Sequence, residues 1–500
     1  MDRAHALSPE VLKGIRRGVE KESLRVRRDG ALATTPHPAA LGSALTHPHI
    51  TTDFSESQPE LITAPHATPE ACIDELTRIH QVVDRALRGE ILWCASMPCG
   101  LPADEAIPIG QYGSSNIGRM KTVYRIGLSH RYGRRMQAIS GIHYNWSIPA
   151  ATNADYFALI RNFRRHSWLV LYLFGASPAV CASFVAGRAH ELEPLTSGTL
   201  YRPHATSLRM GRLGYQSDAQ ATLKVSYNSL ESYGASLQDA LTRPYPPYEA
   251  IGIRDGDGYK QLATSLLQIE NEFYGTIRPK RTIRPGERPL HALRERGVEY
   301  VEVRLMDLDP FLPVGIAAET MRFLDVFLLH CLLAESPPDT PAEIAALGRN
   351  QQTTATRGRE PGVKLARGAR EVPLAEWGGQ LLAECAPFAA ALDAVHGGGA
   401  YRAALDAAVA ALANPDSVPS AKLLRAMARE HDHSYLRCVL ALSHRHAEAL
   451  RAAPLAPEVA AHYARLAEES LAEQRAIEAA DDVPFETYRQ RYLARDRLLA

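Results

Sequence analysis

Carboxylates stand at alternate positions in several short apolar segments, and this spacing could support chemistry. In GVEKESLRV (18–26), Glu20 and Glu22 point the same way if the segment is a strand, because successive side chains alternate between faces. Same-face carboxylates two residues apart lie roughly 7 Å from each other along a strand. One or two bridging cations could bind both, so the pair is a candidate metal site.

Four further segments alternate in a similar way. The residues that they would place on a polar face are Glu60 in 57–65, with Asp53 just upstream; His143, Asn145 and Ser147 in 140–149; Gln268, Glu270, Glu272 and Tyr274 in 267–274; and Glu302 and Arg304 in 299–307. For any one segment alone, the solvated face of an amphipathic strand is the commoner explanation. Together, several such strands would form a sheet that lines an acidic, metal-filled cavity.

Oxygen ligands with one imidazole suit Mg²⁺ or Mn²⁺ better than zinc or iron. Mg²⁺ usually completes its shell with waters and substrate phosphates, so a site of many carboxylates indicates ATP chemistry. The sequence contains neither a Gly-Lys-Ser/Thr phosphate loop nor a GxGxxG fingerprint. The residues therefore predict a nucleotide-dependent or phosphoryl-transfer site without a P-loop.

Several helices can be placed around these segments. Thr68 is a predicted N-cap with Pro69 at the first helical position, and Gly89 closes the segment. Pro457 opens another helix, and residues 321–333 are apolar almost all round, which predicts a buried helix. The uncharged stretch 168–187 is about as long as a membrane span, but its Gly, Ser and Pro residues favour a buried helix that runs into a turn. Residues 349–370 lack an apolar period and are expected to form a loop.

Composition excludes several classes of protein. The chain has 500 residues, of which 46% are hydrophobic and 22% charged, and these values exclude intrinsic disorder, a collagen-like repeat and a coiled-coil rod. Lys plus Arg and Asp plus Glu both number 56, so an electrostatic nucleic-acid binder is disfavoured. No signal peptide is visible at the N-terminus, and we expect a cytoplasmic protein, without a membrane partner and monomeric by default.

Seven scattered cysteines suit a reducing compartment rather than a disulfide framework. Cys94 and Cys99 have the spacing of half a zinc site, but no second pair completes it, so we expect small buried thiols.

The residue composition of the chain changes about two thirds of the way along. Strands mixed with helices fill residues 18 to about 309, and the rest is rich in Ala, Leu, Arg and Glu. We expect an α+β catalytic core over 1–335 and a mainly helical region over 336–500, packed on the core rather than independent.

The ordered set of segments resembles the proteobacterial type of glutamate–cysteine ligase (gamma-glutamylcysteine synthetase). The similar stretches run from residue 12 to about 311 and include LKGIRRGVEKESLRV, QYGSSNIGRMKTVYRIGL, RYGRRMQAISGIHYNWSIP, LQIENEFYGTIRPKR and VEYVEVRLMDLDPF. The resemblance implies a glutamine-synthetase-like fold, with a curved, mostly antiparallel sheet that lines the active site and helices outside. It also implies the first step of glutathione synthesis, in which ATP phosphorylates the γ-carboxyl of L-glutamate and the amine of L-cysteine displaces the phosphate.

The resemblance also implies roles for individual residues. The implied magnesium ligands are Glu20, Glu22, Asp53, Glu60, His143 and Glu302. Arg209 and Arg304 are expected to grip substrate carboxylate or phosphate, and with Glu302 they make up the predicted catalytic set. The implied cysteine pocket consists of Phe54, Tyr124, Leu128, Gln137, Tyr215 and Tyr274. Among the basic residues of the similar segments (Arg119, Lys121, Arg125, Arg278, Lys280 and Arg281), Arg125 ranks first for contact with ATP phosphates.

Two alternatives remain open at this point. One is a related ligase that joins glutamate to an amine other than cysteine, because an apolar pocket rejects an isosteric amine without the thiol only modestly. The other is a non-catalytic relative that senses glutamate or nucleotide. A dense cluster of mutually repelling acids argues against it, because such a cluster costs stability unless cations compensate.

Overall fold

A six-stranded antiparallel sheet stands at the centre of the computed structural model, which describes residues 7–214, 218–221, 223–284 and 286–494. The strand order is β12 (Ile277–Lys280), β13 (Tyr300–Met306), β6 (Ile142–Ser147), β1 (Arg16–Glu22), β4 (Pro59–Ile62) and β3 (Ile50–Thr52). Every neighbouring pair is antiparallel. The predicted α+β fold with an antiparallel sheet and a helical C-terminal region is confirmed.

The two faces of the sheet differ as the alternation predicts. Val19, Tyr144 and Val303 lie on one face and are fully buried. Helices α3 (Pro69–Ala86), α6 (Asn153–Phe174) and α11 (Ala318–Leu333) cover that side: α3 contacts β1 and β4, α6 contacts β12 and β13, and α11 packs against α3 and α6. The opposite face carries the alternating polar residues of β1, β6 and β13.

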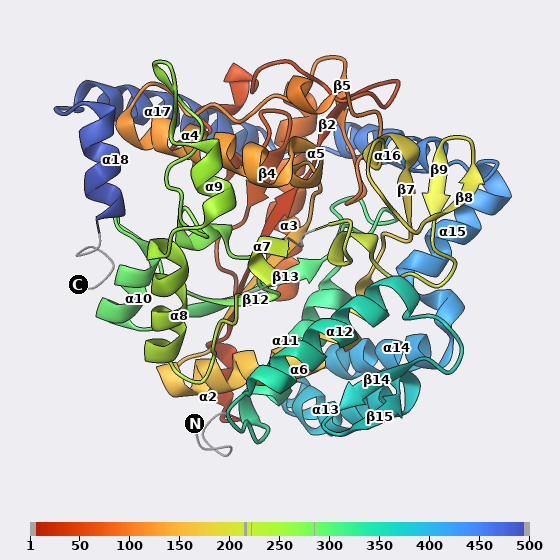
Figure 1. Ribbon diagram of the computed structural model, residues 1–500. Coiled ribbons are helices and arrows are strands. Elements are labelled where there is room, and N and C mark those ends of the chain that lie inside the picture. Colours follow the sequence, from red (N-terminus) through yellow and green to blue (C-terminus); the bar gives the residue numbers. More distant parts are fainter. Residues whose placement is uncertain (1–6, 215–217, 222, 285, 495–500) are drawn as a thin grey trace.

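Other helices surround this core. Those before α11 are α2 (Pro9–Lys13), α4 (Asn116–Tyr132), α5 (Arg134–Gln137), α7 (Asp218–Ala221), α8 (Leu230–Thr242), α9 (Pro246–Ile251) and α10 (Pro289–Arg296). Those after it are α12 (Pro341–Arg357), α13 (Leu374–His396), α14 (Ala400–Ala413), α15 (Pro419–Glu430), α16 (Tyr435–Ala452), α17 (Pro457–Ala479) and α18 (Phe485–Leu493). Figure 1 shows α11 to α14 gathered with α6 in the lower part of the view, whereas α17 and α18 lie beside α4 at the upper left.

Besides the central sheet, the described residues form three two-stranded sheets and one three-stranded sheet. They are β2 (Arg25–Arg27) with β5 (Glu90–Leu92); β7 (Ala179–Cys181), β8 (Glu193–Thr196) and β9 (Thr199–Tyr201); β10 (Arg254–Asp255) with β11 (Gly258–Tyr259); and β14 (Lys364–Arg367) with β15 (Arg370–Pro373).

The predicted helix boundaries have clear local causes. The Thr68 side chain accepts a hydrogen bond from the Ala71 amide at the start of α3, and Pro69 follows at the first helical position. The helix ends at Ala86, just before Gly89. Pro457 begins α17, and α11 is buried over most of its surface, as its composition predicts. The helix expected within the uncharged stretch 168–187 is the end of α6, and it stops before Gly175.

Two secondary-structure predictions are wrong. Residues 349–357 are the end of helix α12, not a loop, and 364–373 form the β14–β15 hairpin. Asn350 and Thr354 are buried one turn apart, and Asn350 bonds to the backbone of Ala366 in β14, so polar contacts stabilise this helix. Residues 270–272 form a 3-10 turn, so the strand predicted over 267–274 is not formed.

The expectation that all cysteines are free thiols also needs correction. Cys99 and Cys181 form a disulfide between the loop after β5 and strand β7, with their Cα atoms 5.4 Å apart. The residues are 82 positions apart, so spacing along the sequence does not reveal the pair. The other five cysteines, including Cys94, are free and buried, as predicted.

The helical C-terminal part shares its core with the first part. The rings of Trp168 in α6 and Trp377 in α13 pack with centroids 4.8 Å apart, and α13 also contacts α2 and α11. The boundary at residue 335 stays a prediction. Among the helices that the structure describes, none has the length and apolar character needed to cross a membrane.

Candidate active site

The polar face of the sheet brings five of the predicted metal ligands together in two groups of three that share Glu60. Ligand atoms of Glu20, Glu60 and His143 lie within 4.8 Å of each other, and so do those of Glu22, Asp53 and Glu60. Strand register explains the arrangement, because Glu20 on β1 faces His143 on β6, and Glu22 faces Glu60 on β4. Asp53 follows directly after β3, the neighbour of β4.

His143 lies at the centre of the cluster. Its Nδ1 is 3.1 Å from Glu20 Oε2 and 3.8 Å from Glu302 Oε1, and its Nε2 is 3.7 Å from Glu22 Oε1. Burial and the nearby Arg304 lower the pKa of His143. A neutral imidazole is the form that binds metal. Since Glu302 Oε1 lies near His143 Nδ1, this sixth predicted ligand also belongs to the cluster.

Crowding of the acids changes their titration. Burial and the neighbouring Asp53 raise the pKa of Glu22 to about 8. Burial, together with Glu20 and Asp53, raises the pKa of Glu60 well above its usual value. Such shifts are expected when like charges share a desolvated site, and divalent cations would reverse them.

Basic residues offset the negative charge of Glu302. Arg304 Nη1 lies 2.9 Å from Glu302 Oε2, and Lys280 Nζ lies 3.1 Å from Glu302 Oε1. Although burial opposes ionisation, Arg304 and Lys280 hold the pKa of Glu302 well below its usual value. Burial likewise acts against ionised Glu20, but its hydrogen bond with His143 leaves its pKa lowered.

These groups line a cavity of ≈ 360 Å³, called here the acidic cavity. All six predicted metal ligands line it, as do Arg125, Lys121, Arg278, Lys280 and Arg304. Arg125 lies over the Tyr112 ring, 4.4 Å from its centroid, and donates to the Asp53 carbonyl, so it points at the acids from helix α4. Tyr488 and Tyr492 of α18 also line the acidic cavity.

Five residues of the predicted cysteine pocket also line the acidic cavity: Phe54, Tyr124, Leu128, Gln137 and Tyr274. The amide of Gln137 donates to the Tyr274 hydroxyl at 2.7 Å, which fixes the position of that ring. Tyr215, the sixth, lies outside the described residues.

Arg209 lies in an adjoining cavity of ≈ 260 Å³, called here the arginine cavity, which shares His143, Tyr274 and Arg304 with the acidic one. Its guanidinium is buried, 3.6 Å from Asp307, and donates to the Arg304 carbonyl. A side chain at Gly141 would collide with this guanidinium, and the Gly141 amide donates to Glu22 at 2.7 Å. Gly141 thus allows Arg209 to approach the metal cluster.

Two acids of the segment 267–274 have structural roles. Glu272 is buried and pairs with Arg131 at 2.8 Å, and Glu270 pairs with Arg288 at 2.7 Å. Neither carboxylate lines the cavities described above.

The basic residues of the similar segments divide between site and surroundings. Lys121, Arg125, Arg278 and Lys280 line the acidic cavity. Arg119 packs over the Phe485 ring, and Arg281 donates to the Arg296 carbonyl away from the cavity.

Sequence reasoning did not single out Asn145 as a site residue. Its amide donates to Glu20 Oε1 at 2.9 Å and so orients that carboxylate. The alternation in 140–149 carried the signal, because Asn145 shares a face with His143. The contribution of Tyr488 and Tyr492 has no comparable signal in the sequence.

Comparison with known proteins adds an independent finding. The family model described as glutamate-cysteine ligase matches residues 4–354. A glutamate–cysteine ligase of Pseudomonas entomophila is 49% identical over 97% of this chain and 95% of its own length. One of Azotobacter vinelandii is 50% identical over 95% of this chain and 94% of its own length.

Solved structures agree with these relatives. The crystal structure of glutamate–cysteine ligase from Francisella tularensis in complex with AMP superposes with a TM-score of 0.91 at 36% identity, covering 96% of this chain and 97% of that one. A bifunctional glutathione synthetase from Pasteurella multocida superposes with a TM-score of 0.69 at 28% identity, covering 89% of this chain and 54% of that one.

Proposed function

The chain belongs to the glutamate–cysteine ligase family, and from that premise we propose how its residues perform the reaction. The enzyme joins L-cysteine to the γ-carboxyl of L-glutamate, with ATP as co-substrate, in the first step of glutathione biosynthesis. The γ-phosphoryl group passes to the glutamate γ-carboxylate, and the cysteine amine then attacks the acyl carbon. Phosphate leaves, and the products are γ-glutamylcysteine, ADP and phosphate.

The proposal for the site is carried by one observation: six groups of magnesium-binding type line one cavity, where burial and neighbouring acids raise the pKa of two of them, Glu22 and Glu60. Five carboxylates and one imidazole suit Mg²⁺ or Mn²⁺. Residues Glu20, Glu22, Asp53, Glu60, His143 and Glu302 would hold the ions. When bound, magnesium would neutralise charge on the triphosphate and on the transferring phosphoryl group.

Basic residues at the rim of the cluster would bind and orient the substrates. Arg125 on α4 is placed to meet ATP phosphates from the side of Asp53. Arg304 lines both cavities and pairs with Glu302, and it would contact the glutamate γ-carboxylate and the transferring phosphoryl group. Arg209, buried in the arginine cavity, would bind substrate carboxylate.

The aromatic part of the acidic cavity would bind cysteine. Phe54, Tyr124 and Tyr274 offer apolar surface for the thiol and exclude water from the acyl phosphate. Gln137 holds Tyr274 by its hydroxyl, which keeps the pocket in shape before substrate binds.

Phosphate release from ATP tests the function directly. The purified chain is incubated with Mg²⁺ and L-glutamate, and L-cysteine or L-2-aminobutyrate is added in turn. We expect release that depends on both amino acids, with γ-glutamylcysteine observed by mass spectrometry. Release that needs glutamate but is indifferent to cysteine would move the acceptor to another amine.

A further inference from the structure

The arginine cavity is suited to an anion. Three arginines line it, Arg164, Arg209 and Arg304, and no carboxylate belongs to its lining in the part of the chain that the structure describes. It adjoins the acidic cavity, with which it shares the lining residues His143, Tyr274 and Arg304. An anionic group of the substrate would therefore find complementary charge immediately beside the acidic cavity.

Arg164, on helix α6, lies over the ring of Tyr227. Its guanidinium carbon lies 4.5 Å from the centroid of Tyr227, and Nη1 lies 3.0 Å from Asp339. Tyr227 is itself buried, and Asp339 is only 4% exposed, so both supports are rigid. Stacking on a ring and a single ion pair fix the plane of an arginine fork, which leaves other N–H groups for a ligand.

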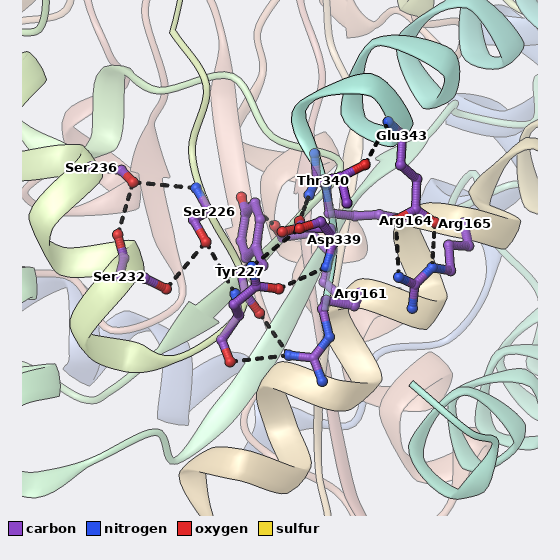
Figure 2. Close-up of polar contacts among 12 residues, drawn as sticks. Arg161, Arg164, Arg165, Ser226, Tyr227, Ser232, Ser236, Asp339, Thr340 and Glu343 are labelled. Atoms are coloured by element: carbon purple, nitrogen blue, oxygen red, sulfur yellow. Dashed lines mark hydrogen bonds and ion pairs between the residues drawn. The ribbon is translucent and has the colours of Figure 1, made fainter. Parts of the chain in front are cut away.

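The neighbouring arginines of α6 bind protein instead. Figure 2 shows Arg161 directed at the backbone of residues 227 and 228 and Arg165 directed at Glu343. Arg161 also bonds to the Ser336 carbonyl, and Arg165 makes two bonds to Glu343, at 2.7 and 3.0 Å. Of these three arginines, Arg164 alone is part of the described lining of the cavity.

We infer that Arg164 binds the α-carboxylate of the L-glutamate substrate; the inference rests on the proposed function and deepens it. The γ-carboxylate of glutamate must reach the phosphoryl group in the acidic cavity. Three carbon atoms separate it from the α-carboxylate, for which the described lining of the adjoining cavity offers arginines and no acid. Beside Arg304, which lines both cavities, that end of the substrate would lie in the arginine cavity, where Arg209 and Arg164 would bind it.

The test compares R164Q with two matched variants. Losing a hydrogen bond between charged groups costs roughly 1.5–3 kcal/mol, so the KM for glutamate should rise about 10- to 100-fold in R164Q, with little change in the KM for cysteine. Discrimination against 4-aminobutyrate, which is glutamate without its α-carboxylate, should fall by a similar factor. R165Q removes a charge one residue away from Arg164, on a side chain outside the lining, and should leave the glutamate KM unchanged. R164K, which keeps the charge without the fork, should fall between wild type and R164Q.

A second comparison separates binding from support of the fold. D339N keeps Arg164 on Tyr227 but weakens its link to the segment that precedes α12. The inference is overturned if D339N reproduces the R164Q phenotype, or if R164Q raises the KM for cysteine instead of the KM for glutamate. It is also overturned if the glutamate KM of R164Q stays within about twofold of wild type, because that change is below the loss expected for one charged hydrogen bond. Equilibrium binding of L-glutamate to wild type and to R164Q tests the inference independently of catalysis. Absence of product with the wild-type chain would contradict the proposed function, and the binding comparison would still test the role of Arg164.

Discussion

Glu20 of β1 and His143 of β6 are register partners in the central sheet, and Glu20 Oε2 lies 3.1 Å from His143 Nδ1. Directly opposite residues of an antiparallel pair point to the same face. The pairing therefore fixes which face of β1 carries the acids. Glu22, two residues on, faces Glu60 in the same way across β4. Two backbone registers thus assemble most of the proposed metal cluster.

We expect E20Q and E302Q to abolish turnover with little loss of fold. Both carboxylates point into the acidic cavity, and an amide of the same shape removes the charge that would hold a cation. The measurement is product formation, with thermal unfolding as the check on folding. E299Q is a suitable control, because Glu299 is exposed beside the same strand and pairs with Arg281 at 3.5 Å. Full activity of either variant would remove that residue from the metal site.

Without divalent cations, the contribution of Glu22 and Glu60 to stability should fall as the pH rises from about 5 to 8. The folded-state pKa of Glu22 is about 8, and Glu60 is also raised, whereas both titrate near 4.5 when unfolded. Between these values the two acids bind more protons in the folded state than in the unfolded state, so their contribution to stability falls with pH. Mg²⁺ should restore the melting temperature, and more at pH 8 than at pH 6, because the ions bind the deprotonated acids.

The comparison that checks this explanation is thermal unfolding in chelator across that pH range. E22Q cannot deprotonate at position 22, so its melting temperature relative to that of wild type should increase as the pH rises. A difference in melting temperature between E22Q and wild type that does not change with pH in chelator, or a magnesium effect that is independent of pH, would show that the acids are not crowded as described.

The site follows from the sequence where alternation alone decides the geometry. Glu20, Glu22, His143 and Glu302 lie on strands, and a period of two places each on a known face. The segment 267–274 shows the same alternation, yet Arg131 and Arg288, both distant in sequence, bind its acids in a turn. Arg164 and α18 join the cavities only through tertiary packing, which a local pattern does not encode.

Y124A should raise the KM for cysteine more than the KM for glutamate. Tyr124 lines the aromatic part of the acidic cavity, on α4 beside Leu128, away from the arginine cavity. Removing the ring deletes apolar contact that is worth roughly 1–3 kcal/mol for a small substrate group, or about 10- to 200-fold in discrimination. Steady-state kinetics with cysteine and L-2-aminobutyrate provide the measurement. Equal increases in the KM values for cysteine and glutamate would remove Tyr124 from the thiol pocket.

Breaking the buried pair between Glu272 and Arg131 should destabilise the fold without removing a substrate contact. The Glu272 carboxylate accepts hydrogen bonds from Arg131, the Tyr132 hydroxyl and the backbone amide of Gln268, all at 2.7–2.8 Å. E272Q leaves Arg131 buried and uncompensated, which typically costs about 3–5 kcal/mol. Chemical denaturation should show a shifted midpoint, whereas E469Q, which removes an exposed pair with Arg465, should show none. Because Glu272 lines neither cavity, E272Q should keep wild-type KM values at temperatures where it is folded. A large rise in KM with unchanged stability would instead assign this carboxylate to the site.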